Sequence, residues 1–468
     1  MSCSIALFIL CFSPGALLTA LTAIAVLTLA AAALLKAAAL VAVLLDPKRN
    51  TDAKPEYHGL ALADVPRISV MVPLYKETQI AQHLVARLQR LNYPRERLEV
   101  LLVTESDDLT TQDTLARTHL PHWMRQVSVP TGRIKTKPRA LNYALDHCKG
   151  DIVGVYDAED APEPDQLLTI AAHFERADPD VACLQGRLDY YNPHQNWLSK
   201  CFTMEYAAWF RVVLPGLARL RLPVPLGGTT LFFRREPLEE LGGWDAHNVT
   251  EDADLGLRLA RRGYRTELAN TVTFEEANCR AWPWVRQRSR WLKGYAITYA
   301  THMRAPRRLL ADLGPWGFLG VQLLFGCTLM QFMLAPVLWS FWAILFGAGH
   351  PVHAALPASA FGAMVTFFVG AEVLNLAVTV FGVSRTQHRR LWPWAVTLIA
   401  YFPLGALAAY KGALEIAGRP FFWDKTSHGI TLDQAPDARS SGSAEPTGQA
   451  TPPGRSLAVS RRPYSSVA

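Results

Sequence analysis

The sequence predicts an α/β domain of the Rossmann-like type, with a mainly parallel sheet, flanked by transmembrane α-helices. Half of the 468 residues are apolar and only 19% are charged, whereas soluble domains carry about 25% charged residues. The apolar runs lie towards both ends of the chain, and most of the charge lies between them. In that central part, short apolar runs typical of buried strands alternate with helical patterns.

The composition also excludes several classes of protein. An apolar fraction of one half rules out a disordered or collagen-like chain. The net charge of +7, from 47 Lys and Arg against 40 Asp and Glu, is a mild excess, so we expect no nucleic-acid partner. Arginines beside the apolar stretches indicate contact with a lipid bilayer. Seven cysteines without a C-x-x-C pair predict neither a zinc site nor a disulfide framework.

Residues 1–45 are predicted to form the N-terminal transmembrane segment. Within them, residues 16–45 are an apolar stretch broken only by Lys36, and a bilayer crossing needs about 20 residues. Lys48 and Arg49 follow at once. The positive-inside bias then places the following domain in the cytoplasm, at the inner (plasma) membrane. A hairpin at Ser13-Pro14-Gly15, and hence two crossings, is an alternative.

The central domain is expected at residues 46–315, ending in an interfacial helix, and transmembrane helices at residues 316–411. The second region contains three apolar stretches, at residues 316–346, 361–383 and 391–409. The loop 347–358 has no Lys or Arg and the loop 384–390 has three arginines, which places them outside and inside. The basic tail after Lys411 then requires an even number of crossings. One of the three stretches must be re-entrant, interfacial or double.

The central domain is predicted to contain strands at residues 68–73, 98–104, 127–129 and 152–156, with helical patterns at 77–91, 140–147 and 165–174. In open sheets of this kind, ligands bind beyond the carboxyl ends of the strands. Acidic residues follow two of these strands directly. We therefore expect the functional residues at this edge of the sheet.

Asp157 and Glu159 follow the strand that ends at Tyr156. Two carboxylates on a turn supply the hard oxygen ligands that Mg²⁺ or Mn²⁺ prefers, and such an ion bridges a diphosphate. The alternative is a solvated acidic turn. Glu105 follows the strand that ends at Thr104 and is a candidate for a hydrogen bond to a base or ribose. Its alternative is a cluster of acids that caps the next helix.

Thr250-Glu251-Asp252 opens a predicted helix. The helix dipole favours acids in a first turn, which is one explanation of the pattern. The other is a catalytic base that accepts the proton of a sugar hydroxyl as it attacks an anomeric carbon. The preceding Gly242-Gly243-Trp244 turn could bring backbone and an aromatic face against a sugar ring.

Gln287, Arg290 and Trp291 are spaced so that they share one helix face. Arginine pairs with phosphate oxygens and tryptophan stacks on a pyranose, so this face suits a nucleotide-sugar. An aromatic and basic belt at the membrane interface is the alternative. Lys137, with Asn142 on the same predicted helix, is a candidate phosphate contact, or else an ordinary surface lysine.

These motifs in order, VPLYKE, ESDD, KPRALN, DAED, a Gly-Gly-Thr stretch, TED and QRSRW, resemble the membrane-bound inverting family 2 glycosyltransferases, which include cellulose, hyaluronan, chitin and poly-N-acetylglucosamine synthases. The resemblance runs from about Arg67 to the C-terminal helices and implies a cytoplasmic GT-A domain. Residues 420–429, PFFWDKTSHG, look like a motif that follows the last membrane helix in a bacterial subgroup. Residues 412–432 are therefore expected to be lid-like, and residues 433–468, rich in Ser, Pro, Gly and Ala, a disordered tail.

The resemblance also implies roles for single residues. It implies that Glu105 contacts the uridine and that Asp157 and Glu159 bind the metal and the diphosphate. It implies that Asp252, in the motif with Glu251, is the general base, that Gly228 lies near the acceptor, and that the diphosphate and the acceptor are bound by Gln287, Arg290 and Trp291. Glu105 and Glu159 replace the usual aspartates, and Asp160 is an alternative metal ligand.

The function expected from this resemblance is inverting transfer from a UDP-sugar, UDP-glucose favoured, to a growing polysaccharide. The product would be a β-linkage, and the reaction would need Mg²⁺ or Mn²⁺. One alternative is a glycolipid synthase that adds one sugar to a lipid acceptor. Another is an inactive scaffold of a polysaccharide export complex, and export or accessory subunits are conceivable partners in either case.

Overall fold

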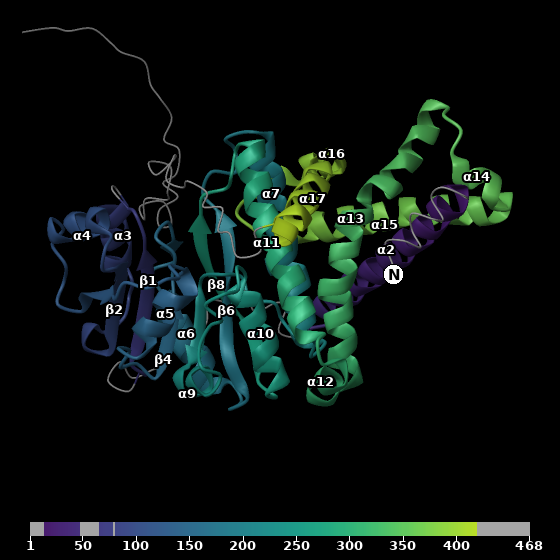
Figure 1. Ribbon diagram of the computed structural model, residues 1–468. Helices are drawn as coiled ribbons and strands as arrows, with labels where there is room; N and C mark the ends of the chain where they lie inside the picture. The colour runs from purple at the N-terminus through teal and green to yellow at the C-terminus, as the bar shows by residue number, and fades with distance from the viewer. Residues whose placement is uncertain (1–13, 47–64, 78–79, 419–468) are drawn as a thin grey trace, which may run out of the picture. The chain divides into compact units, whose positions relative to one another are not determined.

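The computed structural model describes residues 14–46, 65–77 and 80–418 (Figure 1). The predicted tail at residues 433–468 lies outside these ranges, as does Ser13 of the alternative hairpin. The predicted lid-like segment lies outside them beyond Gly418, and its first residues belong to a helix, α17, that ends there. The N-terminal apolar stretch forms a single helix, α2 (Pro14–Leu44).

Eight strands of the described chain form one sheet in the order β3-β2-β1-β4-β7-β6-β8-β5. Their bounds are β1 Ile68–Leu74, β2 Leu98–Glu105, β3 Met124–Val129, β4 Ile152–Val155, β5 Ala161–Pro162, β6 Val181–Tyr190, β7 Leu231–Arg234 and β8 Arg265–Glu275. Pairing is parallel for β1 with β2 and β4, for β2 with β3, and for β6 with β8. Strand β7 is antiparallel to both β4 and β6, and β5 is antiparallel to β8. The mainly parallel sheet is confirmed.

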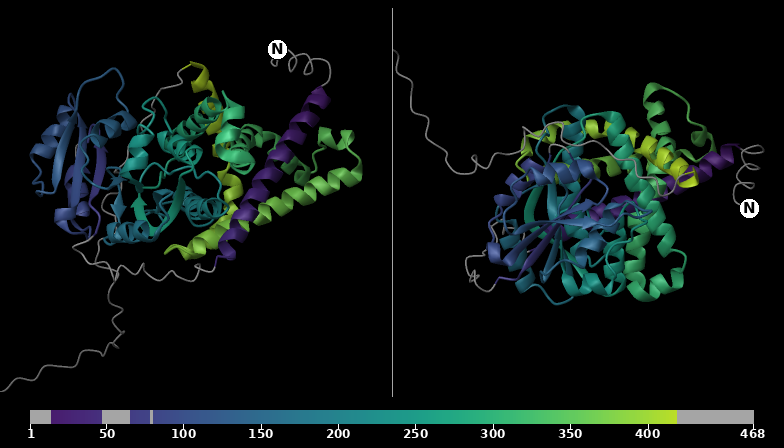
Figure 2. Two further views of the ribbon diagram at one scale, coloured as in Figure 1. Left: turned by 90° about the horizontal axis from the view of Figure 1, so that it is seen from below. Right: turned by 60° about the vertical axis from the view of Figure 1, so that its left-hand side comes forward.

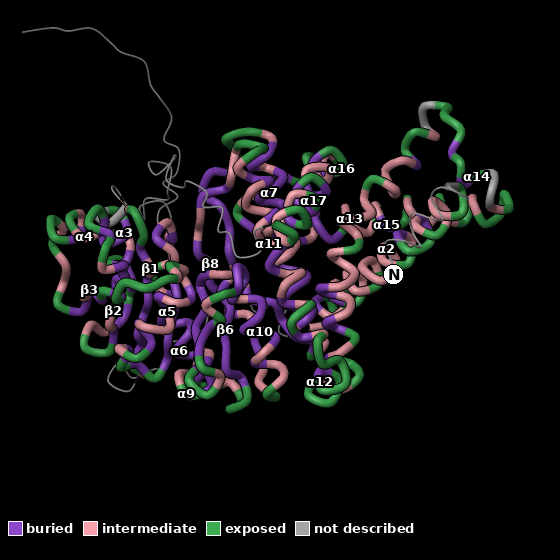
Figure 3. Tube along the Cα trace, in the orientation of Figure 1, coloured by how far each residue is buried: buried purple, intermediate pink, exposed green. Residues whose placement is uncertain are grey.

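Helices cover both faces of this sheet because its buried strands are apolar on both sides. On β1, Val70 and Val72 face one cluster of buried side chains and Met71 faces the other. The first cluster includes α3 (Ile80–Gln89), α4 (Leu109–Ala116) and α6 (Gln166–Arg176). The second includes α5 (Lys137–Leu145), α9 (Arg235–Glu240) and α10 (Glu251–Arg261). Figure 3 shows the strands as the most buried part of the fold.

Beyond the sheet, helices join it to the apolar part of the chain. α7 (Trp197–Ala208) continues through a π-helical turn into α8 (Leu214–Arg219), and α11 (Ala281–His302) precedes α12 (Pro306–Val321). α12 is kinked at Gly314, where the backbone φ is 66°. After a second π-helical turn follow α13 (Thr328–Ser340), α14 (Pro351–Ala355) and α15 (Ala358–Ser384).

Three helical segments of the described chain are long and apolar enough to cross a membrane, namely Gly15–Leu44, Pro306–Ile344 and Ala358–Ser384. They correspond to α2, to α12 with α13, and to α15. α2 packs against both α13 and α15, and Figure 2 shows these helices side by side.

The fourth apolar stretch is bent by 45° between Arg389–Tyr401 and Pro403–Gly418. Its second half, α17 (Pro403–Gly418), packs along α11. The buried ammonium of Lys293 on α11 lies 2.9 Å from the carboxylate of Glu415 on α17. By its geometry this bent pair is either a broken span or a re-entrant segment. A re-entrant segment would satisfy the parity predicted from the basic loops.

Candidate active site

All the residues predicted from the sequence to form the site line one cavity of about 1120 Å³. They are Glu105, Lys137, Asp157, Glu159, Gly228, Glu251, Asp252, Gln287, Arg290 and Trp291. They come from the ends of β2 and β4, from the starts of α5 and α10, from the loop before β7 and from the middle of α11. The fold therefore brings together segments that are up to 186 residues apart, from Glu105 to Trp291.

Asp252 lies in the first turn of α10, after Thr250 at the N-cap position. A β-carbon added to Gly228 would lie 3.2 Å from its Oδ2, so the carboxylate faces the Gly-Gly-Thr stretch. Burial raises the pKa of Asp252 to about 6, although the backbone N–H of Ala253 and the nearby Lys137 lower it. Burial, and then Asp252 itself, raise the pKa of Glu251 to about 7. A carboxylate with such a pKa is a competent proton acceptor near neutral pH.

Lys137 is a cavity residue with defined partners, which distinguishes it from an ordinary surface lysine. Its Nζ lies 2.5 Å from Oδ1 of Asp157 and donates to the carbonyl oxygen of Gly228 at 2.8 Å. Burial lowers the pKa of Lys137, but Asp157, Glu251 and Asp252 together raise it by more than burial lowers it. The ammonium therefore stays charged. A single cation thus links the acids after β4 with the glycine stretch beside Asp252.

The acids after β4 differ in environment. Asp160 is fully buried, accepts a hydrogen bond from the backbone N–H of Asp157 at 2.8 Å and from the hydroxyl of Thr229, and is not part of the cavity wall. In this conformation Oδ2 of Asp160 therefore bonds to the turn and to Thr229, whereas Oδ1 is buried without a hydrogen-bond partner among the described residues. Asp157 and Glu159 line the cavity instead.

A divalent cation fits the cavity wall next to Asp157 and Glu159. Glu275, at the end of β8, also lines the cavity, and burial followed by Asp160, Glu159 and Asp157 raises its pKa well above the ordinary value. Such crowding of carboxylates is what a bound dication relieves. The described residues contain no group of three or more His, Cys, Asp or Glu arranged to hold a metal. A cation at Asp157 and Glu159 would therefore need further ligands, such as phosphate oxygens of a donor.

The acidic cluster after β2 was expected either to contact a ligand or to cap the next helix. Glu105 and Asp108 show that different residues of the cluster occupy these two positions. Asp108 caps α4 and accepts from the backbone N–H of Thr111. Glu105 lines the cavity and lies 3.2 Å from the guanidinium of Arg139. Burial raises the pKa of Glu105 although Arg139 lowers it. Capping therefore explains Asp108, and the cavity position belongs to Glu105.

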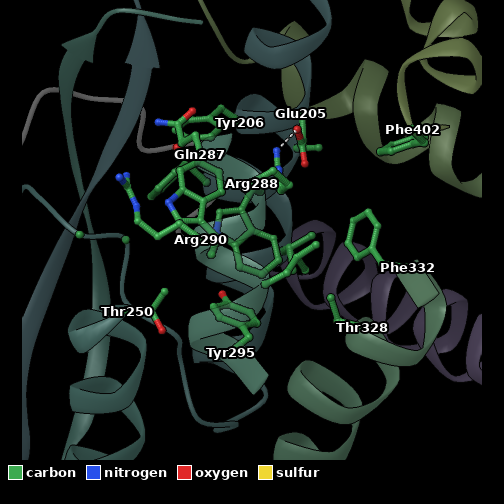
Figure 4. Close-up of a pocket in the computed structure, with 18 of the residues that line it drawn as sticks. Glu205, Tyr206, Thr250, Gln287, Arg288, Arg290, Tyr295, Thr328, Phe332 and Phe402 are labelled. Atoms are coloured by element: carbon green, nitrogen blue, oxygen red, sulfur yellow. Dashed lines mark hydrogen bonds and ion pairs between the residues drawn. The ribbon is translucent and has the colours of Figure 1, made fainter. Parts of the chain in front are cut away.

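Trp291 is held in place by groups on α7 and α11. Arg288 lies over the Trp291 ring, 4.8 Å from its centroid, and donates to Glu205 of α7 at 2.6 Å. Tyr401 donates to the same Glu205 oxygen at 2.6 Å. Figure 4 shows Arg288 turned towards Glu205, whereas Arg290 extends to another side of α11. Arg288 thus positions the indole, and Gln287, Arg290 and Trp291 share the cavity.

The expectation for Trp244 is wrong. Its ring does not face a sugar site, because it is buried edge-on against Phe233 at a centroid distance of 5.7 Å. The side-chain amide of Asn142 donates to the carbonyl oxygen of Trp244 and accepts from the N–H of the same residue. Asn142 and Trp244 therefore join α5 to the Gly-Gly turn as structural residues.

Sequence reasoning missed several residues of the cavity wall. Glu205 and Tyr206 lie on α7, which the sequence analysis did not assign, and Glu275 ends a strand that was also not assigned. An isolated acid within an apolar helical pattern was the only signal for Glu205. Lys36 and Glu372 line the same cavity from the apolar helices, and their charge in apolar runs was a signal that could have been followed.

The fold and the cavity define a GT-A type domain, the class to which nucleotide-sugar glycosyltransferases belong. A solved structure, a mannosyltransferase from Pyrobaculum calidifontis in complex with GDP-Man and Mn²⁺, is similar in fold, with a TM-score of 0.55 and 23% identity over 85% of this chain and 99% of that chain. Residues 152–352 match the glycosyl transferase family group 2. This part of the chain is thus similar to family 2 glycosyltransferases.

Curated relatives agree with this family. The chain is 31% identical over 280 residues to the beta-monoglucosyldiacylglycerol synthase of Synechocystis sp., covering 58% of this chain and 55% of the relative. It is 25% identical over 236 residues to a probable glycosyltransferase of Bacillus subtilis, covering 50% and 56%. It is 27% identical over 216 residues to a probable glucomannan 4-beta-mannosyltransferase of Arabidopsis thaliana, covering 44% and 39%. The chain thus spans about half the length of these relatives or less.

Proposed function

We propose that this protein is an inverting hexosyltransferase that moves a sugar from a UDP-sugar, UDP-glucose favoured, to an acceptor at the inner membrane, with its catalytic domain in the cytoplasm. The observation that carries the proposal is the convergence of Asp252, Lys137 and the Trp291 helix face on one cavity. That cavity continues between the candidate membrane helices. An acceptor from the bilayer and a donor from the cytoplasm then meet in it.

The proposed step joins the acceptor oxygen to the anomeric carbon while the bond from that carbon to the diphosphate oxygen breaks. Asp252 accepts the proton of the acceptor hydroxyl, and UDP leaves with the bonding electron pair. Attack from the face opposite the leaving group inverts the anomeric carbon and gives a β-linkage.

Further residues of the chain bind and orient the donor. Lys137 and Arg290 offer cationic contacts to the diphosphate, and Glu105 lies where a nucleoside would sit beyond β2. Asp157 and Glu159 would hold Mg²⁺ or Mn²⁺, which offsets the charge that builds on the leaving diphosphate. Trp291 presents an aromatic face to the acceptor sugar or hydroxyl.

Two acceptor classes follow from the sequence, a growing polysaccharide and a single lipid. The name of one relative, a beta-monoglucosyldiacylglycerol synthase, favours the lipid, and the glucomannan synthase relative favours the polymer. The length of the product after incubation with a UDP-sugar separates them, because one glycolipid and a ladder of polymers are readily distinguished.

The test of the proposed function is UDP release by membranes that contain the wild type or Asp252→Asn, measured over a panel of UDP-sugars. We expect release from one donor and a loss of roughly 10²–10⁴-fold in Asp252→Asn, the contribution of a general base. Asp113→Asn, an exposed acid of α4, is the matched control. Equal release above background from wild type and Asp252→Asn would remove Asp252 as the base, and no release above background from either would favour the inactive-scaffold alternative.

A further inference from the structure

The membrane end of the active-site cavity contains a charged cluster that the proposed reaction does not use. The ammonium of Lys36 on α2 donates to the side-chain oxygen of Asn375 on α15 at 2.7 Å. Glu372, one helical turn from Asn375, interacts electrostatically with Lys36. All three side chains line the cavity. Ionisable groups between membrane helices are costly, so they mark functional sites by default.

The depth of this cluster follows from the helix geometry. Lys36 precedes the end of α2 at Leu44 by eight residues, which is about 12 Å at 1.5 Å per residue. Asn375 precedes the end of α15 at Ser384 by nine residues, or about 14 Å. Both helices end towards the central domain, since α2 leads into it and α15 returns to the loop that contacts it through Arg211. The cluster therefore lies about one-third to one-half of the way into a bilayer core.

The cavity wall becomes more apolar beyond this cluster. Between the catalytic residues and the cluster it mixes polar side chains, namely Thr328, Gln331 and Thr379, with apolar ones such as Phe332, Leu376 and Val378. Beyond the cluster its residues are Leu29 and Ala32 on α2, Ala335, Leu338 and Trp339 on α13, and Val365, Phe368 and Val369 on α15. The far section of the wall is therefore largely hydrocarbon-like, with the indole N–H of Trp339 as a polar group.

The largely apolar far section favours one of the two acceptor classes. A polysaccharide that is passed across a membrane needs hydrogen-bond partners along the whole path, because each sugar loses its hydration. The far section offers few such partners. It does suit the hydrocarbon tail of an amphipathic lipid, whose polar part then lies between the cluster and Asp252. The cluster itself carries one positive and one negative side chain, so it favours an uncharged polar group over a phosphate.

We propose that Lys36, Asn375 and Glu372 form a binding site for the polar linkage of a neutral lipid acceptor, with ester or amide carbonyls accepting from Lys36 and Asn375. The lipid hydroxyl then faces the part of the cavity that leads to Asp252, and the tail occupies the apolar section beside Ala32 and Ala335. This inference rests on the proposed glycosyl transfer, and it assigns the acceptor as a neutral hydroxyl-bearing lipid of the diacylglycerol type.

The test uses the full chain in nanodiscs with the active UDP-sugar, with and without dioleoylglycerol. We expect dioleoylglycerol to give one glycolipid by mass spectrometry. Lys36→Met and Asn375→Leu should raise the KM for dioleoylglycerol by roughly tenfold to a hundredfold, the effect of losing a charge-assisted hydrogen bond. UDP release without lipid should stay unchanged in both, which also shows that they fold. Thr366→Val, a polar residue of α15 bonded to its own helix at 3.0 Å, is the control.

A steric variant provides a second line of evidence. Ala335→Trp should impair transfer to dioleoylglycerol but spare dihexanoylglycerol, whose tails are short. A polymer product, or an unchanged KM in both polar variants, overturns the lipid assignment while leaving the transferase intact. Transfer to a polyprenyl phosphate in preference to dioleoylglycerol overturns the neutral-lipid assignment. Absence of any UDP release that depends on Asp252 overturns the proposed function, and this inference with it.

Discussion

Gly228 and Asp252 lie so close that a β-carbon on Gly228 would be 3.2 Å from the carboxylate oxygen of Asp252. Gly228 also has a backbone φ of 78°, in the left-handed region that favours glycine. Its carbonyl oxygen accepts from Lys137 at 2.8 Å. A side chain at Gly228 would thus crowd the Asp252 carboxylate, and the Gly228 carbonyl oxygen links this position to the cation that contacts Asp157.

Gly228→Ala should therefore reduce the rate of transfer more than it reduces stability. The positive φ costs roughly 1–3 kcal/mol of folding free energy, and the added methyl group displaces the Asp252 carboxylate from its position. The measurements are UDP release and the thermal unfolding temperature. Gly242→Ala, a glycine of positive φ with open space around it, carries the same backbone strain and is the control. If both variants lose activity equally, strain alone explains the loss.

The rate of UDP release should fall as pH decreases through the range from 7 to 6. Burial raises the pKa of Asp252 to about 6 and that of Glu251 to about 7, with Lys137 opposing both shifts and Asp157 adding to them. A base is active only when deprotonated, so protonation on the acidic side removes activity. A pH–rate profile of donor-saturated enzyme checks this expectation. A profile that is flat from pH 5 to 8 contradicts it.

Lys137→Met should shift the fall in rate on the acidic side of the pH–rate profile to higher pH. Lys137 lowers the pKa of Asp252 and Glu251 by Coulombic attraction, so its removal lets both values rise. The same substitution should increase the KM for the UDP-sugar, because a phosphate contact is lost. Lys135→Met is the control, since Lys135 is paired with Asp107 at the cavity rim. If the fall in rate stays at the same pH in Lys137→Met, Lys137 does not lower the pKa of the base.

Removal of divalent cations should abolish UDP release, and added Mg²⁺ or Mn²⁺ should restore it. Stabilisation of the leaving diphosphate by a cation contributes several kcal/mol, so we expect a loss of roughly 100-fold or more. Glu159→Gln should weaken the cation dependence by raising the concentration needed for half-maximal rate. Full activity in excess chelator would exclude Asp157 and Glu159 as metal ligands.

Arg288→Met should destabilise the protein and impair acceptor use together. It removes the ionic partner of Glu205, whose side chain is 22% exposed, so we expect a loss smaller than the about 3–5 kcal/mol that breaking a fully buried pair costs. It also removes the cation above the Trp291 ring. Arg307→Met, at an exposed position of α12, should leave both properties unchanged. Chemical denaturation and the KM for the acceptor are the measurements, and an unchanged KM would show that Trp291 does not depend on Arg288.

Part of the site was predictable because parallel strands place their carboxyl ends along one edge. Asp157 and Glu105 follow β4 and β2 directly, so their meeting follows from strand order alone. The spacing of Gln287, Arg290 and Trp291 likewise fixes a shared helix face. The local periodicity of the sequence and the residues just after each strand were therefore enough to predict these positions.

Other features depended on packing that no local pattern records. Asp160 and Asp157 are three residues apart, yet one holds the turn and the other lines the cavity, because Thr229 from a distant segment bonds to Asp160. Trp244 and Asn142 resemble ligand residues in sequence but satisfy each other between α5 and the Gly-Gly turn. Only the folded structure shows whether such a polar side chain bonds to another part of the protein or faces the cavity where a ligand would bind.

The sequence by itself determined the class of this protein, because apolar runs at both ends and motifs at strand ends depend on residue order alone. The tertiary structure decided which acids face the cavity and that Lys36 meets Asn375 across 339 positions of chain. Such distant pairs form only when apolar helix faces pack, because burial of these faces sets the distance between the helices. Polar groups that become buried between the helices then form hydrogen bonds with one another.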